Sequence, residues 1–306
     1  MRAARFPAAL VAAAAVLALA ACGDRDTPSP RDRLGAAVSA TGAAGTAAFR
    51  MTARMRTGTG TAGTTMTFTS RGGADLRTGA SRMETELPGL GLSVTMLHDG
   101  DTVFVRLPGL LTGGEPVWIR QPVDALRGGG PAAGTAATDF AGSPARALEA
   151  LRDVRGEIER LGSDTVRGSA VEGFAFSVPG ERLWRGTGEP PRALRGLEVP
   201  ATAWLDARDR LRRMTLEMDL AAALASVREA AGDSLAPRGR ELFQALGTDL
   251  EGTMELDLEL FDFGTGVDTR PPDTARVLDA DSAGRRMLGG PLGTGRGPAT
   301  APADGG

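Results

Sequence analysis

The sequence predicts an α+β domain in which a strongly curved antiparallel sheet wraps around a few helices. Apolar residues alternate with polar ones in about ten segments, a period typical of strands with one apolar face. Few segments have a helical pattern, and one of them interrupts the series of strands. Because an apolar sheet face must be covered or closed on itself, a curved sheet that clasps its helices and leaves a groove is expected.

The first group of strands is expected between residues 49 and 121. Asp99 and Gly100 predict a turn inside this group. Residues 58–63 match the pattern Gly-x-Gly-x-x-Gly, but a strand follows and not a helix, so this segment is interpreted as a hairpin loop. Strands are also expected over 103–107 and 117–121. The alternating apolar residues of the earlier strands are Phe49, Met51, Ala53, Met55, Met66, Phe68, Leu90, Leu92, Val94 and Met96.

A helix is expected next, followed by more strands. Ser143 is placed to cap the helix, and Pro144 suits its first position. Ala147, Leu148, Leu151 and Val154 then form one stripe at helical spacing. The remaining segments are strands over 157–161, 165–168 and 173–178, a hairpin of 200–206 with 210–219, helices over 220–231 and 239–246, and a last strand over 254–261.

The N-terminus predicts export and lipid anchoring. Arg2 and Arg5 precede a short apolar run over 10–19, which is too short to span a bilayer. The order Leu-Ala-Ala-Cys that ends at Cys22 resembles the lipobox of bacterial lipoproteins, in which the cysteine receives diacylglycerol and further acylation, palmitate for example. Two or three acyl chains make a stable anchor. The alternative is an ordinary signal peptide cut after Ala21, with a free thiol.

Four parts of the chain follow from this interpretation. Residues 1–21 are a signal peptide, 22–33 a lipidated flexible tether, 34–282 one domain with a sizeable core, and 283–306 a disordered tail rich in Gly, Pro and Ala. A shorter low-complexity segment over 128–138 is expected as a surface loop. The mature protein is therefore expected on the extracytoplasmic face of the cell membrane.

Composition excludes some partners. All 35 basic residues are Arg, and Lys, Asn and Tyr are absent, a bias that indicates a high-GC actinobacterial genome. Without Arg2 and Arg5, the mature chain carries 33 basic against 38 acidic residues and a net charge of −5. Nucleic acid binding needs a basic footprint, so it is not expected. With a single cysteine, no disulfide within the chain is possible.

Enzyme chemistry finds little support, and neither an enzyme, a cofactor nor a metal site is predicted. His98 is the single histidine and is expected at an exposed position before a turn, while Cys22 is used for lipid. Glu255, Asp257 and Glu259 share one strand face and are interpreted as solvated. A site built from carboxylates alone leaves no short sequence signature and stays an open alternative.

Several short motifs follow one another along the chain. They are Thr102 to Pro108 with Trp118-Ile119, Ser143-Pro144 and the following helix with Leu161-Gly162, Val171 to Phe174, Pro200 to Asp206 with Leu211 to Arg213, and Phe263-Gly264 with Val267 and Pro271-Pro272. In this order they resemble the LppX/LprG-type actinobacterial lipoproteins. The resemblance covers residues 34–281, with Phe104 where a Tyr is usual in the family.

The resemblance implies a LolA-like half-barrel with an apolar cavity for acyl chains of a lipid or glycolipid, and an envelope transporter as a possible partner. The alternative is an envelope lipoprotein that acts through protein contacts and has a filled core. Methionines on the inner face suit an adaptable apolar surface, although each one is equally compatible with an ordinary core. Trp118, Trp184 and Trp204 are candidates for a cavity rim, with Trp204 better explained as a buried hairpin residue. The cavity candidates are Met51, Ala53, Met55, Met66, Phe68, Met96, Phe174, Phe176, Ala203, Met214, Met218 and Met254.

Overall fold

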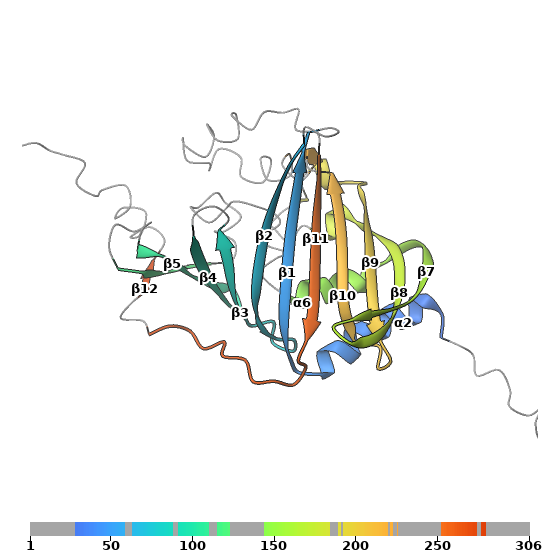
Figure 1. The fold of residues 1–306 in the computed structure, drawn as a ribbon, viewed down its shortest axis with the longest axis horizontal. Coiled ribbons are helices and arrows are strands. Elements are labelled where there is room, and N and C mark those ends of the chain that lie inside the picture. Colours follow the sequence, from blue (N-terminus) through green and yellow to red (C-terminus); the bar gives the residue numbers. More distant parts are fainter. Residues whose placement is uncertain are drawn as a thin grey trace, which may run out of the picture.

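The computed structural model describes residues 28–58, 63–87, 91–109, 115–122, 144–183, 189–190, 192–219, 221–222, 225, 252–273 and 277–279. In these ranges the chain forms a sheet of 12 strands in the order β12-β6-β5-β4-β3-β2-β1-β11-β10-β9-β8-β7 (Figure 1). Neighbouring strands are antiparallel, except that β12 runs parallel to β6. Two meanders, β1 to β6 and β7 to β11, therefore meet where β1 pairs with β11.

The elements have the following bounds. The strands are β1 (Thr46–Thr57), β2 (Thr64–Asp75), β3 (Ser81–Leu87), β4 (Leu92–Asp99), β5 (Thr102–Leu107), β6 (Val117–Pro122), β7 (Arg155–Val166), β8 (Ser169–Pro179), β9 (Glu198–Asp206), β10 (Leu211–Asp219), β11 (Gly252–Phe261) and β12 (Val277–Asp279). The helices are α2 (Pro30–Ala43), α6 (Pro144–Ala150) and α7 (Gly180–Leu183), with short 3-10 helices η2 (Leu151–Asp153) and η3 (Arg192–Leu194).

Helix α2 begins inside the segment that was expected to be a flexible tether. Ser29 caps it, since its hydroxyl accepts a hydrogen bond from the Asp32 amide at 3.1 Å, and Pro30 occupies the first turn. Its buried residues fall at spacings of three and four, as one helix face requires. The apolar stripe was not recognised in the sequence because alanines, glycines and a threonine interrupt it. The buried residues are Leu34, Ala37, Val38 and Thr41.

Helix α6 begins at Pro144, as predicted. Its stripe is confirmed as well, since Ala147, Leu148, Leu151 and Val154 are all buried. The α-helix itself ends earlier than the stripe, because residues 151–153 form the 3-10 turn η2. Figure 1 shows α2 and α6 on one side of the sheet, and their apolar residues join those of the strands in one core.

The segment 165–168 is not a separate strand, and that prediction was wrong. Strand β7 continues through Val166, and β8 starts at Ser169. Arg167 and Gly168 both have positive φ angles, 48° and 76°, as the two central residues of a tight hairpin turn require. Gly162, at φ 87°, lies at one of two register shifts in β7, which explains why its alternation is interrupted.

Strands β3 and β12 were missed because their sequences lack apolar alternation. In β3, Met83 is the deeply buried apolar residue, while Arg82, Glu84 and Glu86 face the other side. The other strands described by the structure agree with the prediction, including the β1–β2 hairpin and the β9–β10 hairpin. Gly100, at φ 57°, forms the expected turn between β4 and β5.

Two polar residues are less exposed than expected. Asp257 was interpreted as solvated but is only 7% exposed, because the guanidinium of Arg213 on β10 covers it and donates a hydrogen bond from Nε to Oδ2 at 2.7 Å. His98 was expected to be exposed but is half-buried, since it lies within β4 between Ser81 and Val103 of the flanking strands. In both cases the cover comes from residues of the neighbouring strands.

Some predictions fall outside the described residues. These are the signal peptide and Cys22, the Ser143 cap, the loop over 128–138, Leu90, Trp184, almost all of the two helices expected over 220–246, and the tail over 283–306.

Candidate functional site: the apolar inner face of the sheet

The inner face of the sheet is built from cross-strand rows of apolar side chains. One row crosses five strands in register, from Phe174 on β8 through Ala203, Met214 and Leu258 to Met51 on β1. Each of these residues is at most 3% exposed. Side chains directly opposite one another on antiparallel strands lie close enough to pack. This row is therefore part of a filled core.

The rows become more exposed toward the end of the sheet where β1 ends and β2 begins. In the next row, Ala201 and Leu256 are buried, whereas Ala53 and Phe68 are only half-buried. The row beyond it consists of Met218, Met254, Met55 and Met66, which are paired in register. Met254 is 4% exposed, Met218 and Met55 are half-buried, and Met66 is 44% exposed. The inner face thus stays apolar along the strands, while its side chains become more exposed to solvent.

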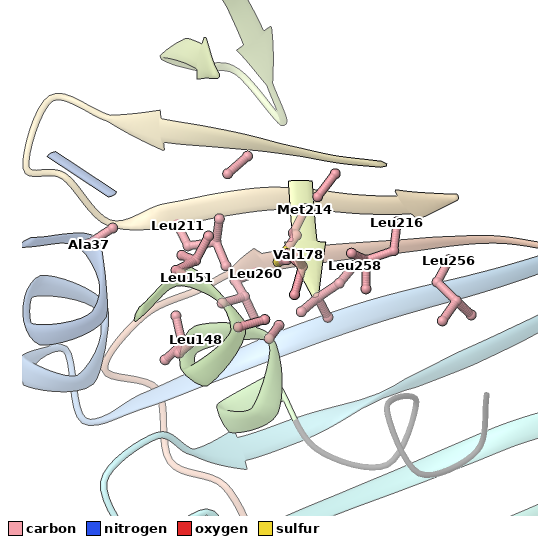
Figure 2. Packing of buried hydrophobic residues seen from close by; sticks show 14 of the residues in the cluster. Ala37, Leu148, Leu151, Val178, Leu211, Met214, Leu216, Leu256, Leu258 and Leu260 are labelled. Carbon is pink, nitrogen blue, oxygen red and sulfur yellow. The ribbon is translucent and has the colours of Figure 1, made fainter. Parts of the chain in front are cut away.

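The helices explain where the face is filled. Leu34 and Ala37 of α2 and Leu148 of α6 belong to the same cluster as the strand residues. Figure 2 shows Leu148 and Leu151 beside Leu211 and Leu260, which lie at the end of the sheet where β10 begins and β11 ends. This end is closed by apolar packing. Leu256 lies further along β11, away from the helical residues in the same view.

The other half of the sheet carries a smaller apolar cluster. Val103 and Val105 of β5 form its buried part, and Val94, Met96 and Leu107 pack against it. Met96 also packs against the main core cluster, so the two clusters are continuous. Sequence reasoning did not name Val94, Val105 and Leu107 as lining residues, although the same alternation marks them. The apolar inner face therefore extends from β8 across the sheet to β5.

The structure brings most of the predicted lining residues together. Six of them are buried in the core cluster and four are partly buried beside it, while Met66 and Phe68 extend it in register with Met55 and Ala53. The buried six have the role of an ordinary core, and the partly buried residues are the ones that a ligand could reach. The buried residues are Met51, Phe174, Phe176, Ala203, Met214 and Met254, and the partly buried ones are Ala53, Met55, Met96 and Met218.

The tryptophans of the described residues do not lie on the inner face. Trp204 pairs in register with Gly173 and is half-buried there, as expected for a hairpin residue and not for a cavity rim. Trp118 lies on the opposite face from Ile119, which is 5% exposed. The hairpin interpretation of Trp204 is therefore confirmed, whereas the rim interpretation of Trp118 is wrong.

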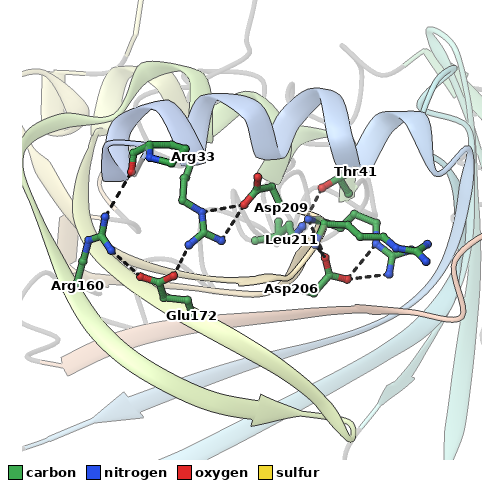
Figure 3. A network of polar contacts seen from close by, with 10 residues as sticks. Arg33, Thr41, Arg160, Glu172, Asp206, Asp209 and Leu211 are labelled. Carbon is green, nitrogen blue, oxygen red and sulfur yellow. Dashed lines mark hydrogen bonds and ion pairs between the residues drawn. The ribbon is translucent and has the colours of Figure 1, made fainter. Parts of the chain in front are cut away.

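Charged residues hold α2 against the strands. Arg33 forms ion pairs with Glu172 of β8 and, at 2.7 Å, with Asp209 of the β9–β10 turn (Figure 3). Burial opposes the charge of this guanidinium, but the hydrogen bonds and charges of Asp209 and Glu172 outweigh it and raise the pKa of Arg33. Arg160 also pairs with Glu172, at 3.1 Å. Arg31 donates to the carbonyl of Val154 at 2.7 Å. The chain is thus fastened to the domain from the start of α2.

Two further findings concern membranes and metals. No helix among the described residues is both long and apolar enough to cross a membrane. Within the same part of the chain, no group of three or more His, Cys, Asp and Glu side chains is placed to hold a metal ion.

Comparison with known proteins finds a likeness only among solved structures, at low sequence identity. No family model and no curated protein matches the chain. Among solved structures it is similar to LprF from Mycobacterium bovis, with 12% identity, a TM-score of 0.44, and coverage of 80% of this chain and 98% of that one. The lipoprotein LppX from Mycobacterium tuberculosis gives 12% identity, a TM-score of 0.42, and coverage of 78% and 99%. A LolA superfamily protein from Nitrosomonas europaea gives 11% identity, a TM-score of 0.26, and coverage of 78% and 94%.

Proposed function

We propose that the chain is a membrane-anchored envelope lipoprotein that binds acyl chains of a lipid or glycolipid and shields them from water. Because the likeness is one of fold only, the proposal rests on the chain's own residues. The observation that carries it is the inner face that stays apolar beyond the end covered by the helices.

The partly covered end of this face has the chemistry that acyl chains require. Each methylene group that leaves water contributes about 0.8 kcal/mol, so a long chain gains substantially from an apolar surface of this width. Met55, Met66 and Met218 are flexible and polarisable, and such side chains adapt to a ligand without a fixed shape. Met66, which pairs with Met55 in this row, is 44% exposed. Burial, and not a chemical reaction, would be the mechanism.

The start of α2 limits how far an anchored domain could lie from the membrane. The carbonyl of Pro28 accepts a hydrogen bond from Arg160 at 3.4 Å, and Arg31 is bonded to Val154. Only residues 23–27 lie between Cys22 and this fastened segment, and an extended chain covers at most ~3.6 Å per residue. A lipidated Cys22 would therefore hold the edge formed by β7 and β8 within ~20 Å of the membrane surface.

The test replaces an alanine by a larger side chain at one partly covered and one buried position of the inner face. Ala53 is half-buried and lies between Phe68 and Leu256 in register, so Ala53→Phe is expected to fill space for acyl chains at near-normal stability. Ala203 is fully buried between Phe174 and Met214. Ala203→Trp is therefore expected to overpack the core and cost about 1–3 kcal/mol of stability, with the melting temperature lowered accordingly.

The measurement is the lipid that co-purifies with the chain from Gly23 onward, together with uptake of a fluorescent fatty acid. Thr52→Phe is the matched control, because Thr52 neighbours Ala53 on the opposite face of β1 and pairs there with Asp257. Loss of lipid in Ala53→Phe but not in Thr52→Phe supports the carrier. If the wild-type chain carries no lipid and takes up no probe, the alternative applies, namely a lipoprotein that acts through protein contacts.

A further inference from the structure

The convex face of the sheet carries a pocket that is separate from the apolar inner face. The segment 262–273 leaves β11 and runs past the lower ends of β1, β2 and β3 toward β12, as the orange trace in Figure 1 shows. The amide of Gly264 donates to the carbonyl of Thr46 at 2.8 Å. Val267 lies on Gly73 so closely that a Cβ there would be 2.7 Å from its methyl carbon. The segment is thus fixed to the sheet at its start.

Further along, the segment and the sheet border an open pocket of about 620 Å³. Trp118 supplies an aromatic side chain from β6, and its place on the convex face follows from its position beside the buried Ile119. Arg82 lies next to Met83 and likewise faces outward. The lining residues are Arg82, Trp118, Asp268, Arg270, Pro271, Pro272 and Asp273.

The charges of this lining balance. It contains two guanidinium groups and two carboxyl groups. Arg270 donates from Nε to Asp268 at 2.9 Å, and this hydrogen bond, with a second one from the Arg270 amide, lowers the pKa of Asp268 to about 2. Both groups of that pair are therefore charged at neutral pH, and each compensates the other.

The equal number of guanidinium and carboxyl groups favours some classes of ligand over others. An anion would approach the two guanidinium groups but would also meet two carboxylates, and a cation would meet the reverse. A purely apolar ligand would remove water from four charged groups at a substantial cost. A neutral molecule with many hydroxyl groups avoids both penalties, because carboxylates accept hydrogen bonds from hydroxyls and guanidinium groups donate to them.

Trp118 adds an apolar surface to these polar groups. One face of a pyranose ring consists mainly of C–H groups, and an aromatic side chain offers a flat apolar area for it. We propose that this pocket on the convex face binds a neutral saccharide, with Trp118 against the sugar ring and Asp268 and Arg270 bonded to its hydroxyls. The site would give the protein a second contact, to glycans of the envelope, that does not use the inner face.

The experiment is a calorimetric titration of the full chain in micelles of a detergent without a sugar headgroup. The neutral probes are maltotriose, cellotriose and mannotriose, and the charged probes are trigalacturonate and inorganic phosphate. Saturable binding of at least one neutral trisaccharide is expected, with an affinity that exceeds that for both charged probes. Arg270→Gln and Trp118→Ala are each expected to weaken it by about tenfold or more.

Two matched controls exclude indirect effects. Arg195 forms an exposed ion pair with Glu189 at 2.7 Å elsewhere on the surface, so Arg195→Gln repeats the chemical change of Arg270→Gln outside the pocket. Trp204→Phe changes a tryptophan that lies outside the pocket and is the control for Trp118→Ala. Both controls are expected to bind the trisaccharide as the wild type does. Arg270→Gln keeps the test decisive if Trp118→Ala fails to fold, because the Arg270 side chain is 87% exposed.

Three results would overturn the proposal. They are the absence of binding of all three neutral trisaccharides, tighter binding of trigalacturonate or phosphate, and unchanged binding in Arg270→Gln. None of these results depends on whether the inner face carries acyl chains, so the two proposals fail separately.

Discussion

The hydroxyl of Thr41 accepts a hydrogen bond from the backbone amide of Leu211 at 2.8 Å, across 170 positions of sequence (Figure 3). Thr41 is fully buried in α2, and Leu211 is the first residue of β10. The pairing of β10 with β9 shifts its register between Leu211 and Arg213, which disturbs the regular ladder. Helix α2 thus supplies a hydrogen-bond partner that the neighbouring strand does not provide.

Removal of this acceptor is expected to destabilise the domain. Thr41→Val keeps the shape of the side chain but leaves the buried Leu211 amide without an acceptor. Such a loss costs about 1–3 kcal/mol in the free energy of unfolding, which urea denaturation measures. Thr41→Ser retains the hydroxyl and is the control. Equal stability of Thr41→Val and wild type would show that the amide finds another partner.

The carboxyl of Asp206 predicts a pH dependence of stability. Burial opposes its ionisation, but the Arg210 side chain and the amides of Arg210 and Arg208 donate hydrogen bonds that outweigh this effect and lower the pKa of Asp206. A carboxyl with a lowered pKa stabilises the fold above its unfolded pKa of ~3.9, and this contribution disappears as the pH falls through the folded pKa.

Asp206→Asn is therefore expected to be less stable than wild type at pH 7 by about 1–2 kcal/mol. The difference should narrow below about pH 4, where the wild-type carboxyl begins to gain its proton. Urea denaturation at a series of pH values measures this difference in the free energy of unfolding. Asp164→Asn, at an exposed carboxyl of β7, is the control. A stability difference that is the same at pH 7 and pH 3 would show that charge is not the cause.

Gly173 is required by the indole ring of Trp204. A Cβ at position 173 would lie 2.5 Å from Cζ3 of that ring. Gly173→Ala is expected to cost about 1–3 kcal/mol, and the cost should be smaller in a Trp204→Ala background. Gly35→Ala is the matched control, since a Cβ there meets nothing within 4 Å in an exposed part of α2. That change is expected to stabilise the protein by about 0.5–1 kcal/mol.

The lipobox that ends at Cys22 predicts that this cysteine is lipidated. Cys22→Ser removes the sulfur that would receive diacylglycerol, so the protein is expected to stay unlipidated and incompletely processed. Partition between detergent and water, together with the mass of the N-terminal peptide, measures this. Thr27→Ser is a control in the same segment. A Cys22→Ser protein that still enters the detergent phase with the wild-type mass would contradict the lipobox interpretation.

The strands and their inner faces were predictable because of local periodicity. Met254, Leu256 and Leu258 alternate strictly with acidic residues, and the structure confirms that they face the core. Helix α2 was less predictable, because its stripe contains Ala37 and Thr41 in place of large apolar residues. For Thr41, burial is favourable only because of its bond to Leu211. That partner lies far away in the sequence, so no local pattern indicates it.

The candidate site was predictable as a set of residues but not as a division between core and accessible surface. Ala53 and Ala203 are the same residue type in the same kind of alternation, and both were proposed as lining. The structure places Ala203 in the filled part of the core and Ala53 at the partly covered end. The difference depends on where α2 and α6 lie on the sheet, which strand periodicity does not encode. The convex pocket was not predictable either, because it depends on where the segment 262–273 runs relative to β3 and β6.

The sequence by itself determined most of the strands and the apolar side of each of these, because successive side chains of a strand point to opposite faces. Only the tertiary structure decided that β1 pairs with β11 and so joins the two meanders, and that α2 and α6 cover one end of the inner face. Strand order and helix docking depend on contacts between residues far apart in the chain. Those contacts are selected by the free energy of the whole packed core and not by the period of any one segment.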